Sequence, residues 1–424
     1  MALMKNVLCI GIIIVFFAIG VGTVSAGTSS EQGPFSELRL TADDLFGDKE
    51  YGRSVAIDGD LVAVGAGGDG YIGTIYLYKR QGMIYVPEAE LDFPDPIPEM
   101  CPQPGITGNC SEFGRTVAIQ GNTVFVGARF APVDTTTGTI HAGAVYVFHK
   151  QGDSWQLVDK IVSPSPQKGD NFGRALAVQG NLLVVTARKN TAERGASYVY
   201  EYTGDRWIHQ ATLEAGDSAD GDYFGQSVDI QGGVIAIGAR NADPNDAGGF
   251  YLFRQSAGEW TEFEKVTPPD GKKNDHFGFT IVISGNDIAV GSRRADITNN
   301  GDEGAVYIYS LKGDSVDLVR KLTSSDASTG DEFGQSVAFA GDSIAVGAWK
   351  DDIDGNPDQG SIYTFSRKGG QWVETGKIMA SDGMANDEFG FSLAAFGDRM
   401  VTGAHKADSG AGAAYVLPLK PQAL

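Results

Sequence analysis

A cationic side chain follows a Gly-Ala or similar pair at several regularly spaced points of this sequence. Seven positions are equivalent in this respect: Gly67, Arg129, Arg188, Arg240, Arg293, Trp349 and His405. Guanidinium groups gathered in one place would bind a carboxylate or another anion. Each could instead pair with an acid two residues before the nearest aromatic-Gly pair, since five such acids recur: Asp170, Asp222, Asp275, Asp331 and Asp387. A feature that recurs in nearly every repeat usually belongs to the architecture, so the pattern favours structural ion pairs.

Arg129 differs from the other arginines, because Ser111 stands where the repeats of those arginines have aspartate; the first repeat has Lys49 there, but it also lacks the arginine. If pairing occurs within each repeat, Arg129 is the least neutralised cation, and Phe130 beside it could add an apolar contact. The segments 92–110 and 129–141 also depart from the repeat and are expected on one face, where loops usually carry recognition. The sequence therefore predicts a ligand between these segments, with Arg129, Phe130, Arg188, Arg240, Arg293 and His405 as the candidate binding residues.

One acidic loop has the alternation of a calcium site. Asp352, Asp354, Asn356 and Asp358 place an oxygen at every second position, which resembles the start of an EF-hand loop. The closing bidentate glutamate is missing, and a solvated acidic loop is the alternative. Calcium is the one cofactor that the sequence suggests.

Catalytic patterns are sparse. Five histidines are scattered along the chain, and no nucleophile elbow, zinc-binding HExxH or phosphate-binding glycine loop occurs. The many acids leave open a carboxylate pair for glycan chemistry. The sequence therefore favours a binding module over an enzyme.

The first 26 residues have the form of a secretory signal peptide. Lys5 precedes an apolar run over 7–22, and Val24-Ser25-Ala26 offers small residues for cleavage before Gly27. The alternative is an uncleaved anchor, in which case alone a membrane is a partner. The sequence predicts a secreted protein.

Cysteine usage agrees with an oxidising compartment. Cys101 and Cys110 are the two cysteines outside the predicted signal peptide, and they are expected to form a disulfide. Asn109 begins an N-glycosylation sequon, which matters if the source is a glycosylating cell.

The chain is acidic, with 33 Lys and Arg against 54 Asp and Glu. Most of such a surface repels polyanions, so nucleic acid and anionic membranes are excluded as expected partners.

An aromatic-Gly pair recurs seven times, at intervals of 52 to 62 residues between successive glycines. The pairs begin at Tyr51, Phe113, Phe172, Phe224, Phe277, Phe333 and Phe389. Each precedes four short segments of alternating apolar and polar residues, for example 334–339, 343–348, 361–365 and 372–379. Four antiparallel strands repeated radially predict an all-β propeller with seven blades. Tryptophans recur at the start of the fourth segment and are expected to pack at the blade edges: Trp155, Trp207, Trp260 and Trp372.

The two ends of the chain indicate a closed ring. The last repeat stops after its third segment, 413–417, whereas the segment 38–42 matches the fourth segment of the other repeats. An N-terminal strand that completes the last blade would hide two open sheet edges. We therefore expect one domain over 27–424, with blades beginning near residues 48, 111, 170, 222, 275, 331 and 387 and the outer strand of the last blade at 36–43.

These repeats resemble the FG-GAP family, whose units build the N-terminal propeller of integrin α chains. The resemblance covers residues 35–419 and rests on the aromatic-Gly anchors and on Gly-Ala pairs such as Gly65-Ala66 and Gly347-Ala348. The family's proline after Gly-Ala is absent. The acidic calcium loop between the first two strands is also absent, because a tight turn such as Asp58-Gly59-Asp60 replaces it.

The resemblance implies a monomeric, secreted recognition or adhesion module that binds an extracellular protein or glycan on one face of the propeller. An enzyme acting on extracellular glycans, a lyase or a hydrolase, and a structural protein of the cell envelope are the alternatives, since propellers have many functions.

Overall fold

The computed structural model describes residues 37–42, 45, 49–68, 72–95, 110–135, 138–242, 245–298 and 301–419. Residues 1–36 lie outside these ranges, so the signal peptide and secretion stay predictions. Within the described ranges, no helix is both long enough and apolar enough to cross a membrane.

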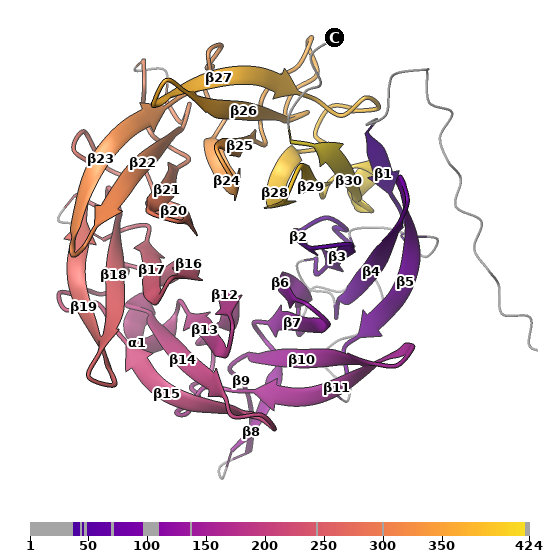
Figure 1. Cartoon of the computed structure of the whole chain (residues 1–424), viewed down its shortest axis with the longest axis vertical. Coiled ribbons are helices and arrows are strands. Elements are labelled where there is room, and N and C mark those ends of the chain that lie inside the picture. The colour runs from indigo at the N-terminus through magenta and orange to yellow at the C-terminus, as the bar shows by residue number, and fades with distance from the viewer. Residues whose placement is uncertain are drawn as a thin grey trace, which may run out of the picture. The chain divides into compact units, whose positions relative to one another are not determined.

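Seven four-stranded antiparallel sheets surround a common axis, as Figure 1 shows. Blade 1 consists of β2 (Ser54–Asp58), β3 (Leu61–Ala66), β4 (Thr74–Gln81) and β5 (Ile84–Asp92). Blade 2 consists of β6 (Phe113–Gln120), β7 (Thr123–Ala128), β10 (Ala144–Gln151) and β11 (Ser154–Ile161). Blade 3 consists of β12 (Phe172–Gln179), β13 (Leu182–Ala187), β14 (Ala196–Tyr202) and β15 (Trp207–Leu213).

The remaining blades repeat this order from the axis outward. Blade 4 consists of β16 (Phe224–Gln231), β17 (Val234–Ala239), β18 (Gly249–Ser256) and β19 (Glu259–Val266). Blade 5 consists of β20 (Phe277–Ser284), β21 (Asp287–Ser292), β22 (Ala305–Lys312) and β23 (Ser315–Leu322). Blade 6 consists of β24 (Phe333–Ala340), β25 (Ser343–Ala348), β26 (Ser361–Lys368) and β27 (Gln371–Ile378). Blade 7 consists of β28 (Phe389–Phe396), β29 (Arg399–Ala404), β30 (Ala413–Pro418) and β1 (Leu38–Leu40).

Loops carry the few other elements. A hairpin of β8 (Pro132–Thr135) and β9 (Gly138–His141) rises from blade 2 between its second and third strands. The corresponding loop of blade 3 contains the single turn α1 (Asn190–Glu193), and that of blade 7 contains the 3₁₀ turn η1 (Asp408–Gly410).

The ring closes through the N-terminal strand. β1 pairs with β30 in register Leu38↔Val416, and Leu40 is buried in the core next to blade 1. Arg39 also takes the position that a lysine has in the fourth strand of other blades. It pairs with Asp382, and the Tyr415 hydroxyl donates a hydrogen bond to the same carboxylate at 2.9 Å. In blade 5, Lys321 and the Tyr307 hydroxyl bind Asp270 in the same way. The predicted closure is confirmed.

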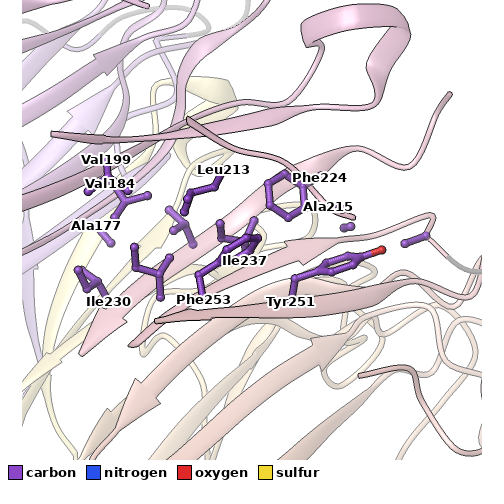
Figure 2. Packing of buried hydrophobic residues seen from close by; sticks show 14 residues of the cluster. Ala177, Val184, Val199, Leu213, Ala215, Phe224, Ile230, Ile237, Tyr251 and Phe253 are labelled. Carbon is purple, nitrogen blue, oxygen red and sulfur yellow. The ribbon is translucent and has the colours of Figure 1, made fainter. Parts of the chain in front are cut away.

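Hydrophobic cores lie between neighbouring blades. The core shared by blades 3 and 4, seen in Figure 2, packs Val184, Val199 and Leu213 of one blade against Ile237 and Phe253 of the next. The anchor Phe224 is fully buried in it. Trp372 is buried and Trp155, Trp207 and Trp260 are partly buried against such cores, as predicted.

Glycine on the second strand permits close approach of the blades. A Cβ at Gly65 would collide with the carbonyl oxygen of Gly114 in the next blade, which is why no side chain fits here. The Ser54 hydroxyl donates a hydrogen bond to the same carbonyl at 2.8 Å. Equivalent serine or threonine links join blades 2, 4, 5, 6 and 7 to their neighbours. In blade 3 the two residues are Ala175 and Thr186 instead.

Candidate functional site

Three side-chain positions per blade meet at the end of the ring where each second strand ends, which we call the crown end. The crown position follows the second strand and comprises Gly67, Arg129, Arg188, Arg240, Arg293, Trp349 and His405. The left-handed position precedes each aromatic anchor and comprises Glu50, Glu112, Asn171, Tyr223, His276, Glu332 and Glu388. The bulge position follows each anchor glycine and comprises Arg53, Arg115, Arg174, Gln226, Phe279, Gln335 and Phe391.

Backbone pairing brings the three positions together. The anchor pairs with the last residue of the second strand, as in Phe172↔Ala187, so Asn171 and Arg188 lie at the same end of one ladder. The residues at the left-handed position all have a positive φ, between 49° and 60°. A break in register follows each anchor from blade 2 to blade 7, and the residue in the break is displaced from the regular pleat.

The ion pairs predicted for the five recurrent aspartates are not formed. Each carboxylate accepts a hydrogen bond from a backbone N–H three residues earlier, at 2.7–2.8 Å. These aspartates therefore hold the turns between blades. Burial raises the pKa of Asp275 to about 6 and that of Asp331 to about 7.

The arginine partners are glutamates at the left-handed position. Glu112 receives Arg129 Nε at 2.6 Å and Nη2 at 2.9 Å, and Arg115 approaches it to 3.4 Å. Arg129 was expected to be the least neutralised cation of the crown. That expectation is wrong, because Arg129 is neutralised by Glu112, which immediately precedes the anchor Phe113.

Glu332 has the same role in blade 6. It binds Arg293 of blade 5 at 2.9 Å and Lys350 of its own blade at 3.1 Å. One buried carboxylate thus neutralises cations from two neighbouring blades.

Blades 3, 4 and 5 lack this acid, because Asn171, Tyr223 and His276 replace it. Arg188 donates to the Gln226 side chain at 2.8 Å, and its guanidinium lies 5.1 Å from the Tyr223 ring centre. Arg240 lies 4.6 Å from the same ring. Among the described residues, no carboxylate comes within 4 Å of Arg188, Arg240 or Arg174.

The cations in this part of the ring repel one another. Burial, and then the charges of Arg240 and Arg129, lower the pKa of Arg188 to about 10. Burial, followed by Arg240 and Arg293, lowers the pKa of His276 to about 3, so this imidazole is neutral at physiological pH.

Blades 6 and 7 present aromatic rings at the same positions. The ring centres of Phe391 and His405 are 3.9 Å apart, and Trp349 contacts Phe391 edge to face at 5.3 Å. His405 is buried, which lowers its pKa well below the usual value, and the Arg53 charge adds to this effect. His405 Nε2 lies 3.2 Å from Glu388, whose pKa burial raises to about 7. His405, predicted as a ligand-binding cation, is therefore a neutral packing residue.

Part of the predicted ligand site lies outside the described residues. The segment 96–109, which includes Cys101 and Asn109, is not among the described residues, so the disulfide and the sequon stay predictions. Cys110 is buried. Phe130 lies beneath the Arg129 guanidinium at 4.8 Å, and its carbonyl contacts His141 Nδ1 at 2.9 Å at the base of the β8–β9 hairpin.

The acidic loop of blade 6 is a turn fixed by its own side chains. Asp352 accepts the backbone N–H of Asp358 at 2.9 Å, and the Asn356 amide donates to Gln359 at 3.0 Å. Asp354 and Asp358 both have positive φ. Over the described ranges, no three His, Cys, Asp or Glu side chains are close enough together to hold a metal ion. Calcium binding stays a prediction.

These features define a seven-bladed β-propeller with a side-chain crown at one end. FG-GAP repeat sequences match seven segments: residues 35–78, 110–148, 155–200, 207–253, 260–309, 316–365 and 372–417. The chain therefore belongs to the FG-GAP repeat family. No curated protein matches it closely enough to be named as a relative.

Sequence reasoning placed the crown arginines at one end of the ring but missed the residues that decide their charge state. Arg174 escaped notice because arginine occurs at the bulge position in blades 1, 2 and 3 only. Its spacing, directly after an anchor glycine, was the signal that could have revealed it.

Proposed function

We propose that the chain is a secreted recognition module that binds an extracellular protein or glycan at the crown end of its ring. One observation carries the proposal: an acidic protein keeps partly exposed arginines at this end without giving each of them a carboxylate partner. Arg188 and Arg240 make no ion pair with any described residue, so a ligand carboxylate or other anion would gain charge-assisted hydrogen bonds there.

The ring supplies rigidity for such a site. Each crown residue directly follows a buried central strand, such as β13 or β17, and the bulge residues follow the anchors. A site on such a scaffold loses little conformational entropy when a ligand binds. The neighbouring β8–β9 hairpin could add contacts on the blade 2 side.

A glycan array probed with the secreted protein tests the proposal, with turnover of the same glycans measured in parallel. The double variant Arg188→Gln/Arg240→Gln should weaken binding of the best ligands by about 10- to 100-fold, as expected for two charged hydrogen-bonding groups. Arg254→Gln is the matched control, because Arg254 pairs with Asp314 near the opposite end of the ring. The proposal would be overturned if Arg254→Gln reduced binding and the double variant did not. Turnover of a bound glycan into product would also overturn it.

A further inference from the structure

Blade 3 departs from the repeat at several positions around one arginine. Asn171 replaces the acid, Ala175 replaces the serine or threonine of the inner strand, and Thr186 replaces the second-strand glycine. The Thr186 hydroxyl accepts the backbone N–H of Ala175 at 3.1 Å. Blade 3 thus lacks the inner-strand hydroxyl that links blades elsewhere, and a second-strand hydroxyl instead holds the bulge that carries Arg174. The break in register extends to Leu176.

The Arg174 side chain has no partner in the part of the chain that the structure describes. Its backbone N–H donates to the Asn171 carbonyl at 3.1 Å, but no group of the described residues accepts a hydrogen bond from its guanidinium, and Nε is buried. The side chain as a whole is half-buried, so solvent still reaches part of it.

The surroundings of Arg174 are strongly cationic. Burial lowers its pKa well below the usual value, and Arg188, Arg115, Arg129 and Arg53 lower it further. The acid of blade 2, Glu112, is already shared by Arg115 and Arg129. Glu193 accepts the Tyr223 hydroxyl and pairs with Lys189 at 2.9 Å. Neither carboxylate is left to neutralise Arg174.

Two further guanidinium groups are fixed at the same end of blades 3 and 4, Arg188 next to Arg174 in blade 3 and Arg240 next to Arg188 in blade 4. Arg188 and Arg240 both lie over Tyr223, and the Arg188 side chain is also held by Gln226. The Nε atoms of both arginines are buried without a hydrogen-bond acceptor. Three cations, each with donors to spare, therefore converge on the crown end of blades 3 and 4.

We propose that Arg174, Arg188 and Arg240 form an oxyanion site that takes the sulfate or phosphate group of a ligand. A dianionic tetrahedral group presents acceptors in several directions and balances more of this charge than a single carboxylate can. This site makes the proposed function more specific. It rests on that function only for the claim that the anion belongs to an extracellular protein or glycan.

Titration calorimetry of the full secreted chain with inorganic sulfate and with inorganic phosphate tests the site, at constant ionic strength with acetate as the monoanionic comparison. We expect saturable binding of sulfate or phosphate and at least about 10-fold weaker binding of acetate. Arg174→Gln and Arg188→Gln should each weaken the oxyanion by at least about 10-fold, whereas Arg254→Gln should leave it unchanged. Sulfated glycans and phosphate monoesters then distinguish the two sources of the group.

Melting temperatures separate this role from a structural one. In chloride buffer Arg174→Gln should melt at or above the wild-type temperature, because it removes an unneutralised charge, and it should no longer be stabilised by sulfate or phosphate. No saturable oxyanion binding by the wild type, or binding that Arg174→Gln retains, would overturn the oxyanion site. If oxyanions bind but no glycan or protein ligand does, the proposed function fails and the site stands.

Discussion

Two arcs of the same ring share one backbone arrangement but carry different side chains at the crown end. Around blades 6 and 7 the three crown-end positions hold Glu332, Glu388 and the mutually contacting rings of Trp349, Phe391 and His405. Around blades 3 and 4 they hold arginines without acids. In the first of these, the aromatic arc, the rings pack against one another and an acid precedes each anchor, whereas the second, the arginine arc, has no acid at that position. The difference shows that the repeat sets the places of these side chains, while the residue before the anchor, in the same blade or in the next, decides whether a crown arginine has a carboxylate partner.

Opening the ring should produce the largest effect. Deletion of residues 35–44 removes β1, exposes the edge of β30 and empties the place of Leu40 in the core. We expect unfolding to become easier by at least about 3 kcal/mol, since a buried leucine alone is worth about 2–5 kcal/mol. Hydrogen exchange should rise first in blades 7 and 1, next to the aromatic arc, and last in blades 3 and 4.

The matched control for this deletion shortens the β8–β9 hairpin, an appendage of blade 2 that pairs with no blade strand. Its removal should leave the melting temperature nearly unchanged. If the chain without β1 melts like the wild type, closure contributes little, and the two arcs would have to differ for another reason.

Removing the acid of blade 2 should convert a neutralised position into one like blade 3. Glu112 is buried and binds Arg129 and Arg115, so Glu112→Gln removes the buried carboxylate that both arginines contact. Breaking a buried pair in this way typically lowers the free energy of unfolding by about 3–5 kcal/mol, which urea titration measures. Asp314→Asn, which breaks the exposed pair with Arg254, should lower it by less than about 1 kcal/mol. Equal effects of the two substitutions would show that burial does not strengthen the crown pairs.

The sequence predicted the fold because the fold is repetitive. The anchors at Phe172 or Phe333 and the short fourth strand at Leu38–Leu40 are signals that recur or complete a recurring unit. The partner of Arg129 was not predictable by spacing alone, since the repeats carry acids both one residue and two residues before the anchor, at nearly the same distance in sequence from the crown position. The backbone decides between them: the residue before the anchor has a positive φ and contacts the crown, whereas Asp170 or Asp331 caps its own turn.

The acid of the aromatic arc should make stability depend on pH. Burial raises the pKa of Glu388 to about 7 from an ordinary value near 4.5, so the folded protein binds its proton more tightly than the unfolded chain does. The contribution of this group is therefore fully present below about pH 4.5 and is lost as the pH rises through 7. Glu388→Gln should flatten the pH dependence of the free energy of unfolding by about 2–3 kcal/mol between pH 5 and 8.

The arginine arc should not contribute to this pH dependence. Arg188→Gln should leave the slope between pH 5 and 8 as it is, because the pKa of Arg188 is about 10 and the guanidinium stays charged throughout. A wild-type slope that Glu388→Gln does not change would assign the dependence to the turn aspartates, such as Asp331 with its pKa of about 7.

The smallest expected change in stability tests the comparison most directly, by giving blade 3 the acid it lacks. Asn171 has the same positive φ as the glutamates of blades 1, 2, 6 and 7, so Asn171→Glu places a carboxylate on a backbone that already accepts one elsewhere. The new acid should neutralise Arg174 and Arg188 and raise the free energy of unfolding by about 1 kcal/mol, after the conformational cost of replacing asparagine in a left-handed position. It should also abolish sulfate and phosphate binding. Asn171→Gln, of the same size without the charge, should do neither. If Asn171→Glu destabilises the protein and leaves oxyanion binding intact, an acid at this position does not neutralise the arginines of blades 3 and 4. The residue before the anchor would then not explain the difference between the two arcs.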